Sequence, residues 1–382
     1  MRNIWKQVVA VALSLALCLS FAGCYDENKT WAARQGDDEM PIGGYIYYLY
    51  SAYSEAASKV DTETAVLDSE IEGEDASQWI KDLAMNYLQA YYYIENKFDE
   101  YGLEMTEEDQ EQVENTTSSL WPYYQSTMED MGISRSSFEQ AYSLYGVKFQ
   151  KVMAAMYGEG GELALDENAM KDYYCDSYVT YEYFYAPLTT TNDDGDSVDL
   201  TDEEKADLKS KFETYVDEIN AGNTTVSDAA DEYAESSGTT SSYQGPVSIK
   251  PDNLSSEIST ALSSAKDNEA VFAETTSGYY VLRKLSVKEY YEANVVGNED
   301  QITSLLSDMK GEEFNDYVLE QATSVEGIEV NDKAINSVKL SKLVTDSNRN
   351  GTSSETESSS STDESSSAEE SSTTESETSS EA

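Results

Sequence analysis

The residues that could perform chemistry form a narrow set, because the sequence contains no histidine. The chain has 382 residues, among them 75 Asp and Glu, 24 Lys and Arg, three cysteines and 30 tyrosines. Without imidazole there is no Ser-His-Asp or Cys-His nucleophile, no histidine-ligated zinc and no histidine general base. Carboxylates are abundant enough for glycoside hydrolysis, but nothing in their arrangement selects one pair. The usual catalytic groups of chemistry at neutral pH are therefore missing.

The acidity of the chain limits its partners. Its formal net charge is -51, and a duplex nucleic-acid binder needs clustered Lys and Arg to neutralise phosphates. We therefore expect no nucleic-acid partner. The loop from Asn192 to Asp196 resembles part of a calcium loop, but the motif spacing is not met, which favours a polar turn. We expect neither a metal nor a cofactor, since the sequence has no Cys/His cluster and no Gly-rich phosphate loop.

The first residues predict export and a lipid anchor at Cys24. Arg2 and Lys6 precede an uncharged apolar run, Val8 to Phe21, which is typical of a secretory signal and too short to span a membrane. Cys24 follows Phe21-Ala22-Gly23, a pattern that resembles the lipobox of bacterial lipoproteins. The resemblance implies that Cys24 is acylated and becomes the mature N-terminus. An ordinary cleaved signal that leaves Cys24 as a free thiol is the alternative.

The remaining cysteines build no disulfide framework. Cys18 leaves with the signal peptide, and Cys175 then has no intramolecular partner. Cys175 is interpreted either as a half-buried residue at the end of a helix or as a reactive thiol.

Two stretches of different periodicity must position any site. Residues 41–175 repeat apolar residues every three or four positions, as in Trp79–Tyr91 and Phe138–Met153, and Thr106 and Ser134 begin segments that a hydroxyl could cap. This predicts an assembly of helical hairpins in which most aromatic side chains are core and some are exposed.

Residues 176–287 change to strands and helices. An alternating segment from Val179 predicts a strand that ends at Pro187, and Thr201 with Glu204 forms a capping box that opens a helix. Two further helices and a closing strand are expected at 226–234, 254–262 and 278–285. This order predicts an α+β unit in which helices cover a small sheet.

Three segments of this unit resemble parvulin-type peptidyl-prolyl isomerases: VTYEYFYAPL, INAGNTTVSDAADEYAES and TTSGYYVLRKL. The preceding helices, GLEMTEEDQ, MGISRSSFEQAY and LDENAMKDYY, look like the N-terminal chaperone region of the SurA and PrsA-type foldases. In those proteins a late segment packs back onto the helical region, and residues 288–345, which include Phe314, could supply that segment here.

The resemblance also locates a site whose polar centre is altered. Active parvulins carry a histidine in the first strand and another in the last, and alignment places Tyr183 and Tyr280 there, so no catalytic residue is assigned. The apolar positions that hold the proline ring correspond to Leu254, Ile258 and Leu262. Together these five residues are the predicted peptide-binding site. The sequence leaves isomerase activity as an alternative, because rotation about an X-Pro bond needs no proton transfer. The two tyrosines could either donate hydrogen bonds in the pocket or fill it.

The sequence as a whole predicts an α+β chain with a disordered tail. The expected divisions are a lipoprotein signal peptide (1–23), a linker (24–40), a helical chaperone-like domain (41–175), a parvulin-like domain (176–287), a segment that packs on the helical domain (288–345) and a Ser/Thr/Glu-rich tail (346–382). The predicted function is that of a membrane-anchored extracytoplasmic foldase for unfolded or proline-containing exported polypeptides. A surface adhesion or solute-binding lipoprotein without chaperone activity is the alternative.

Overall fold

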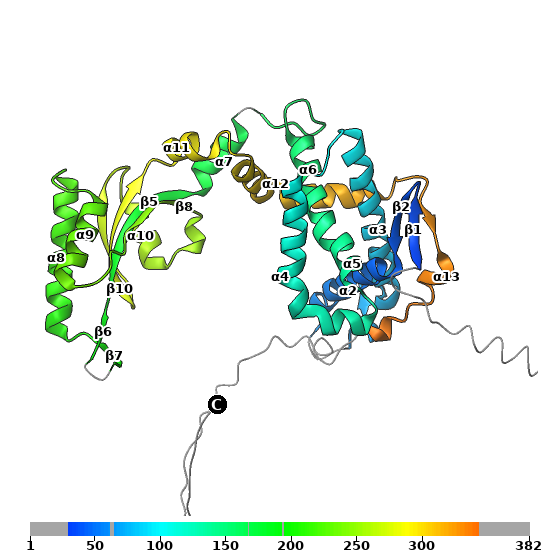
Figure 1. Ribbon diagram of the computed structural model, residues 1–382, viewed down its shortest axis with the longest axis horizontal. Coiled ribbons are helices and arrows are strands. Elements are labelled where there is room, and N and C mark those ends of the chain that lie inside the picture. The colour runs from blue at the N-terminus through cyan, green and yellow to red at the C-terminus, as the bar shows by residue number, and fades with distance from the viewer. Residues whose placement is uncertain (1–29, 62–64, 167, 193–194, 344–382) are drawn as a thin grey trace, which may run out of the picture.

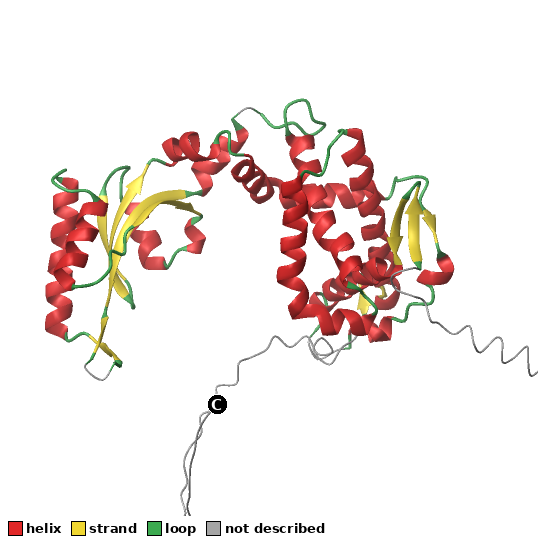
Figure 2. Cartoon of the chain, viewed as in Figure 1, coloured by secondary structure: helices red, strands yellow, loops and turns green. Residues whose placement is uncertain are grey.

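The computed structural model describes residues 30–61, 65–166, 168–192 and 195–343, which form a helical domain and a sheet domain (Figure 1). Two chain crossings join the domains. Helix α7 (Ala169–Ser177) leads into the sheet domain, and α11 (Val287–Tyr290) with the π-helical segment η4 (Tyr291–Val295) leads out of it. The sheet domain is therefore inserted into the chain of the helical domain, and the predicted α+β class is confirmed (Figure 2).

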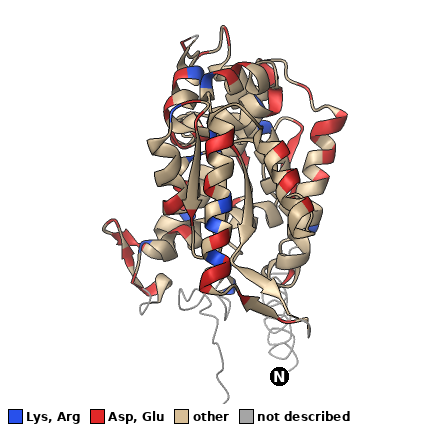
Figure 3. Ribbon diagram, turned by 90° about the vertical axis from the view of Figure 1, so that its left-hand side faces the viewer, with Lys and Arg blue, Asp and Glu red and all other residues tan. Residues whose placement is uncertain are grey.

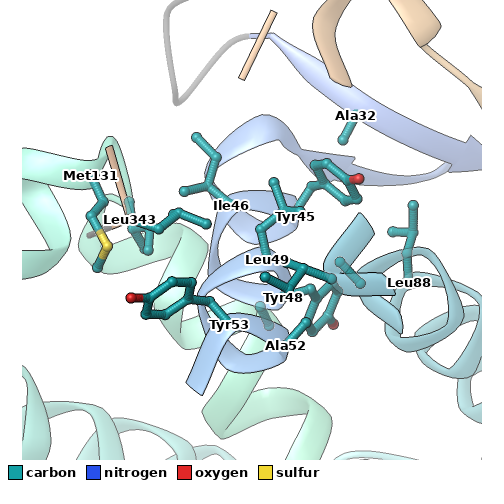
Figure 4. Close-up of a cluster of buried hydrophobic side chains, with 14 of the residues drawn as sticks. Ala32, Tyr45, Ile46, Tyr48, Leu49, Ala52, Tyr53, Leu88, Met131 and Leu343 are labelled. Atoms are coloured by element: carbon teal, nitrogen blue, oxygen red, sulfur yellow. The ribbon is translucent and has the colours of Figure 1, made fainter. Parts of the chain in front are cut away.

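The helical domain is built mainly on long helices. These are α2 (Ile42–Ser58), α3 (Ala76–Glu100), α4 (Glu107–Met131) and α6 (Tyr145–Tyr157). Shorter elements connect them: η1 (Val66–Asp68), β3 (Glu70–Ile71), β4 (Glu74–Asp75), α5 (Arg135–Phe138) and the π-helical segment η2 (Glu139–Leu144). Figure 4 shows the core around α2, where Tyr45, Ile46, Leu49 and Tyr53 are buried and Leu88 approaches from α3.

The helix boundaries follow the predicted caps. The Thr106 side chain accepts a hydrogen bond from the Asp109 N–H at 3.1 Å, and Asp109 returns the contact to the Thr106 N–H at 2.7 Å, which completes a capping box for α4. The Ser134 hydroxyl caps α5 through the Ser137 N–H at 3.2 Å. The predicted helix starts are therefore confirmed, and Gly132 ends α4 in the left-handed conformation that glycine adopts without strain.

The predicted linker at 24–40 is wrong for its described part. Residues Trp31–Gln35 form β1 and Asp38–Pro41 form β2, and β11 (Glu329–Val330) pairs with β1 on its other side. Ala32, Ala33 and Met40 are completely buried against the helical core. Periodicity within 24–40 could not reveal this, because β1 gains its second partner from a segment almost 300 residues later in the chain.

The C-terminal segment packs on the helical domain. Helix α12 (Glu299–Ala322) contacts α3 and α6, and Phe314 lies in the same buried cluster as Ile94 and Met153. Beyond β11, α13 (Asp332–Ile335) and η5 (Leu340–Lys342) run along the domain to Leu343, which is buried near Met131 (Figure 4).

The sheet domain is a four-stranded antiparallel sheet in the order β8-β5-β10-β9. Its strands are β5 (Val179–Pro187), β8 (Gln244–Ile249), β9 (Ala270–Glu274) and β10 (Gly278–Leu285), so the predicted first and closing strands are confirmed. Helices α8 (Asp202–Asn220) and α9 (Val226–Ser237) pack against one face through Phe212 and Ala230. Helix α10 (Ser256–Ser264), which follows η3 (Pro251–Asn253), packs against the other face through Leu262. The Thr201 and Glu204 capping box opens α8 as predicted.

A hairpin extends from the sheet domain at the predicted polar turn. It consists of β6 (Thr189–Thr191) and β7 (Ser197–Asp199), and the Asn192 side-chain oxygen accepts a hydrogen bond from the Asp196 N–H at 2.8 Å. Among the described residues no group of acidic side chains or cysteines is arranged to hold a metal ion.

The junction between the domains is held at Asp308 on α12. The Tyr173 and Tyr178 hydroxyls each donate to its Oδ2 at 2.9 Å, and Lys250 at the end of β8 pairs with its Oδ1. Burial alone would raise the pKa of Asp308, but the hydrogen bonds from Lys250, Tyr178 and Tyr173 together lower it. One carboxylate therefore links the sheet domain to the helical domain.

Substitution of Asp308 by Asn is expected to cost about 1 kcal/mol of stability at pH 7, since it removes a charged acceptor that is partly exposed. Because the folded pKa lies below the ordinary Asp value of about 3.9, the stabilisation is complete above that value and is lost as the pH falls through the folded pKa. The stabilities of the wild type and of Asp308→Asn in urea unfolding should therefore differ most at pH 7, and the difference should be smaller at pH 3. An equal difference at both pH values would contradict this role of Asp308.

Several predictions concern residues outside the described ranges. The signal peptide at 1–23, acylation of Cys24 and the tail at 346–382 all fall there. Within the described ranges, none of the helices combines the length and apolar character that crossing a membrane requires.

Candidate functional site

The predicted site residues converge on the face of the sheet that α10 partly covers. Tyr183 comes from β5, Tyr280 from β10, and Leu254, Ile258 and Leu262 from α10 and the residues before it; all five belong to one apolar cluster. They meet because β5 and β10 are adjacent and antiparallel, with Tyr183 opposite Leu282 and Tyr185 opposite Tyr280, so these side chains share one face.

The centre of this face is a row of aromatic rings, here called the tyrosine platform (Tyr181, Tyr183, Tyr280 and Tyr185). Neighbouring ring centroids along the row lie 5.6, 6.0 and 5.4 Å apart, and the Tyr280 and Tyr185 rings are stacked at 20°. Tyr181 is buried, Tyr183 and Tyr280 are half-buried, and Tyr185 is 40% exposed. The row thus runs from the core to the surface and presents aromatic faces at its open end.

A serine holds the open end of the platform in place. Strand β8 pairs with β5 as far as Tyr183, opposite Gln244, after an irregularity in the ladder. Beyond that point Ser242 takes the place of a strand partner: its hydroxyl accepts from the Tyr185 N–H at 3.1 Å and donates to the Tyr185 carbonyl at 2.6 Å. The backbone of Tyr185 is therefore satisfied while its ring stays exposed.

The opposite face of the same strands carries a polar contact that fixes their alignment. The Arg283 Nε lies 3.0 Å from Glu182 Oε1 across the β5-β10 pair, and the Tyr243 hydroxyl donates to Glu182 Oε2 at 2.7 Å. Burial, followed by the hydrogen bond to Glu182, raises the pKa of Tyr243 to about 12. Tyr243 therefore remains a protonated donor at neutral pH, and this group braces the platform from behind.

The chemistry of the platform is apolar contact with phenolic hydrogen-bond donors. Burial is the largest influence that raises the pKa of both Tyr181 and Tyr183, with neighbouring tyrosines adding to it, so both hydroxyls stay protonated at neutral pH. A peptide segment placed there would meet rings and hydroxyl donors but no imidazole, because the sequence has none.

A cavity of about 430 Å³ lies beside this site rather than at it. It is bounded by Ser259 and Leu262 on α10, by Cys175 on α7 and by Lys288 on α11, whereas Tyr183 and Tyr280 are not among its lining residues. Cys175 is half-buried near the end of α7, and burial is the largest influence that raises its pKa, which disfavours the reactive thiolate. The structure therefore favours the interpretation of Cys175 as a helix-end residue.

A second aromatic cluster lies on the helical domain and is called the helical aromatic patch (Tyr47, Phe138 and Tyr142); Phe138 is buried, Tyr47 is half-buried and Tyr142 is exposed. Tyr142 is 41% exposed and stacks on Phe138 with centroids 5.1 Å apart, while Tyr47 meets both rings edge-on at 5.6 and 6.0 Å. Tyr142 projects from η2, and such π-helical turns frequently occur at functional positions. Sequence periodicity placed Tyr142 on the same helical face as Phe138 but could not show that it is exposed.

Sequence reasoning also missed Tyr181, Tyr185 and Ser242 as members of the site. The alternation of β5 contained the signal for both tyrosines, since residues 181, 183 and 185 must share a face. Ser242 had no such signal, because its contact depends on where β8 leaves the sheet.

Acidic residues surround these surfaces. Figure 3 shows Asp and Glu distributed over the helices and loops of the protein, with far fewer Lys and Arg. An acidic surface of this kind attracts basic segments and repels acidic ones.

Comparison with known proteins gives matches among solved structures alone. No protein-family model matches the chain, and no curated protein matches it in sequence. The foldase PrsA of Lactococcus lactis matches 83% of this chain and 100% of its own at 12% identity and a TM-score of 0.35. PrsA of Streptococcus pneumoniae str. Canada MDR_19A matches 72% of this chain and 99% of its own, at 12% identity and a TM-score of 0.36. PrsA of Bacillus subtilis matches 70% of this chain and 95% of its own, at 14% identity and a TM-score of 0.31. These three neighbours are PrsA proteins.

Proposed function

We propose that this chain is a foldase of the extracytoplasmic side of the membrane, which binds unfolded exported polypeptides at the tyrosine platform. The observation that carries the proposal is the open end of the platform, where Tyr280 and Tyr185 stack with Tyr185 exposed. Aromatic rings of this kind contribute large contact area at low conformational cost and accept many different apolar partners. Such tolerance suits a protein whose clients have no common sequence.

The lipid anchor belongs to the same proposal. It rests on the sequence, in which Cys24 follows a signal-like segment, and it would keep the protein at the membrane where exported chains emerge. The helical aromatic patch offers a second contact for a long client. The acidic surface would keep a loaded complex soluble and favour basic clients over acidic ones.

Isomerisation of X-Pro bonds is the finer part of the proposal. The barrier is of order 20 kcal/mol and involves no proton transfer, so a site that desolvates the amide and binds its twisted form more tightly can act without histidine. Tyr183 and Tyr280 supply rings with hydroxyls at the positions where the resembled family has its histidines. We propose binding as the main activity and treat isomerisation as a property of the same platform.

The chain from residue 25 onward is expected to suppress aggregation of a chemically unfolded test protein at near-stoichiometric amounts, as measured by light scattering. The physical reason is that the platform covers apolar segments that would otherwise associate. Polyglutamate of matching charge serves as the control and should have no effect. No suppression at several-fold excess, or saturable binding of one folded ligand without affinity for unfolded chains, would contradict the foldase and favour an adhesion or solute-binding lipoprotein.

A further inference from the structure

The last described segment of the chain differs in charge from the rest of the protein. Residues 331–343, here called the basic segment, contain Lys333, Lys339 and Lys342 against one acidic residue, Asp332, in a chain where acidic residues outnumber basic ones 75 to 24. All three lysine side chains are exposed. A local excess of positive charge on so acidic a protein therefore marks one surface as different.

The basic segment begins beside the start of β1 and ends against the helical core. The Asn331 N–H donates to the Ala32 carbonyl at 2.8 Å, and its side-chain amide donates to the Trp31 carbonyl at 2.9 Å. Ala334 near the start of the segment and Leu343 at its end are buried in the helical core. The backbone is thus fixed by contacts at both ends of the segment, while the residues Lys333, Lys339 and Lys342 are exposed.

The start of β1 is also where the chain leads back toward Cys24. Thr30 lies six positions after Cys24 in the sequence, and a fully extended chain of six residues spans at most about 20 Å. A lipid anchor at Cys24 would therefore keep the start of β1 within roughly 20 Å of the bilayer surface, whatever path the chain follows. The tether therefore allows the basic segment to approach the headgroups, and its charges act on them once they lie within the Debye length of about 8 to 10 Å.

Other charged groups lie along β1. Arg34 lies over the Trp31 ring at 4.8 Å and is paired with Glu329 at 2.6 Å, so this pair is neutral overall. The acidic turn at Asp37 and Asp38 lies at the opposite end of β1, a strand about 16 Å long. Figure 1 shows α13 beside β1 at one end of the molecule and the sheet domain at the other.

We propose that the basic segment docks the anchored protein against an anionic lipid leaflet and so directs the sheet domain away from the membrane. The proposal rests on the proposed lipid anchor. Each lysine near an anionic surface strengthens association about fivefold, whereas the acidic remainder of the protein is repelled. One orientation is therefore favoured, with the helical domain at the membrane and the tyrosine platform accessible to chains beyond it.

Lysine footprinting of the full-length mature protein tests this proposal. The acylated protein is placed in vesicles of phosphatidylcholine alone or with one third phosphatidylglycerol, treated with an amine-acetylating reagent and analysed by mass spectrometry. Lys339 and Lys342 should react at least about threefold more slowly on the phosphatidylglycerol vesicles at low salt, and the difference should disappear at 1 M salt. Lys266 and Lys288, exposed lysines of the sheet domain and the second crossing, should react equally on both.

A pair of matched variants separates the basic segment from total charge. Lys339→Glu/Lys342→Glu and Lys266→Glu/Lys288→Glu change the net charge by the same amount. The first should abolish the slower reaction of Lys333 on phosphatidylglycerol, and the second should preserve it. Equal acetylation on both vesicle types, slower reaction of all lysines alike, or protection by soluble polyphosphate but not by phosphatidylglycerol would overturn the proposal.

The same experiment separates this proposal from the foldase itself. The mass of the mature N-terminal peptide shows directly whether Cys24 carries acyl chains, and a mature chain without them would overturn the docking proposal. Client binding does not enter the footprint, so its outcome is independent of the aggregation assay.

Discussion

Replacement of Phe314 by alanine is expected to lower the free energy of unfolding of the helical domain by about 3 to 5 kcal/mol. Phe314 is completely buried on α12, and its ring centroid lies 4.8 Å from that of Phe149 and 5.9 Å from that of Tyr157. The substitution would leave a cavity where α12, from the end of the chain, contacts α6, from its first half. The expected loss is large because the surrounding helices cannot collapse around the missing ring.

Tryptophan fluorescence is suited to this measurement. The described tryptophans, Trp31, Trp79 and Trp121, all lie in the helical domain, so their emission during urea titration follows that domain even if the sheet domain unfolds separately. The control is Tyr123→Ala, whose side chain is 83% exposed and whose loss should change stability by less than about 0.5 kcal/mol. If Phe314→Ala behaved like the control, α12 would not be part of the domain's cooperative core.

Replacement of Tyr280 by alanine is expected to weaken binding of an unfolded, proline-containing peptide by roughly tenfold to thirtyfold, since central aromatic side chains dominate binding energy. Tyr280 lies between Tyr183 and Tyr185 in the platform, with ring centroids 6.0 and 5.4 Å away, so its loss interrupts the aromatic row. Tyr280→Phe and Tyr183→Phe keep the rings and should bind within about twofold of the wild type. Fluorescence anisotropy of a labelled peptide measures the affinities.

A control variant and an isomerase assay complete this prediction. Tyr123→Ala removes a more exposed tyrosine from the helical domain and should leave the affinity nearly unchanged. A protease-coupled isomerase assay on the same variants then separates catalysis from binding: slower isomerisation by the Phe variants at unchanged affinity assigns a role to the hydroxyls. If Tyr280→Ala bound the peptide as well as the wild type, the platform would not be the binding site.

Local sequence signals predicted those parts of the fold that local interactions determine. The caps at Thr106, Ser134 and Thr201 and the alternation of β5 each act within a few residues, and all were confirmed. Strand β8 was not predicted, and Gly245 and Pro246 interrupt its sequence. Proline is tolerated there because β8 is an edge strand, a fact that depends on the order of the sheet.

In the candidate site, too, some features follow from local sequence and others depend on distant parts of the chain. Tyr183 and Tyr280 could be named from the sequence through a resemblance, and the register of β5 and β10 brings them to one face. Their stacking with Tyr181 and Tyr185 follows from that register, whereas the contact of Ser242 with Tyr185 does not, because it depends on the departure of β8 from the sheet. The strands at 31–41 were missed for a related reason, since their burial requires β11 from the far end of the chain.

Hydrogen exchange of the mature chain, followed by mass spectrometry with and without a saturating unfolded peptide, tests the central claim most directly. The account predicts slower exchange on binding in residues 181–185, 239–249 and 254–262, which surround the tyrosine platform, and unchanged exchange in α9 on the opposite face of the sheet. Exchange that stays the same around the platform while the peptide is bound, or slows in the helical domain alone, would contradict it.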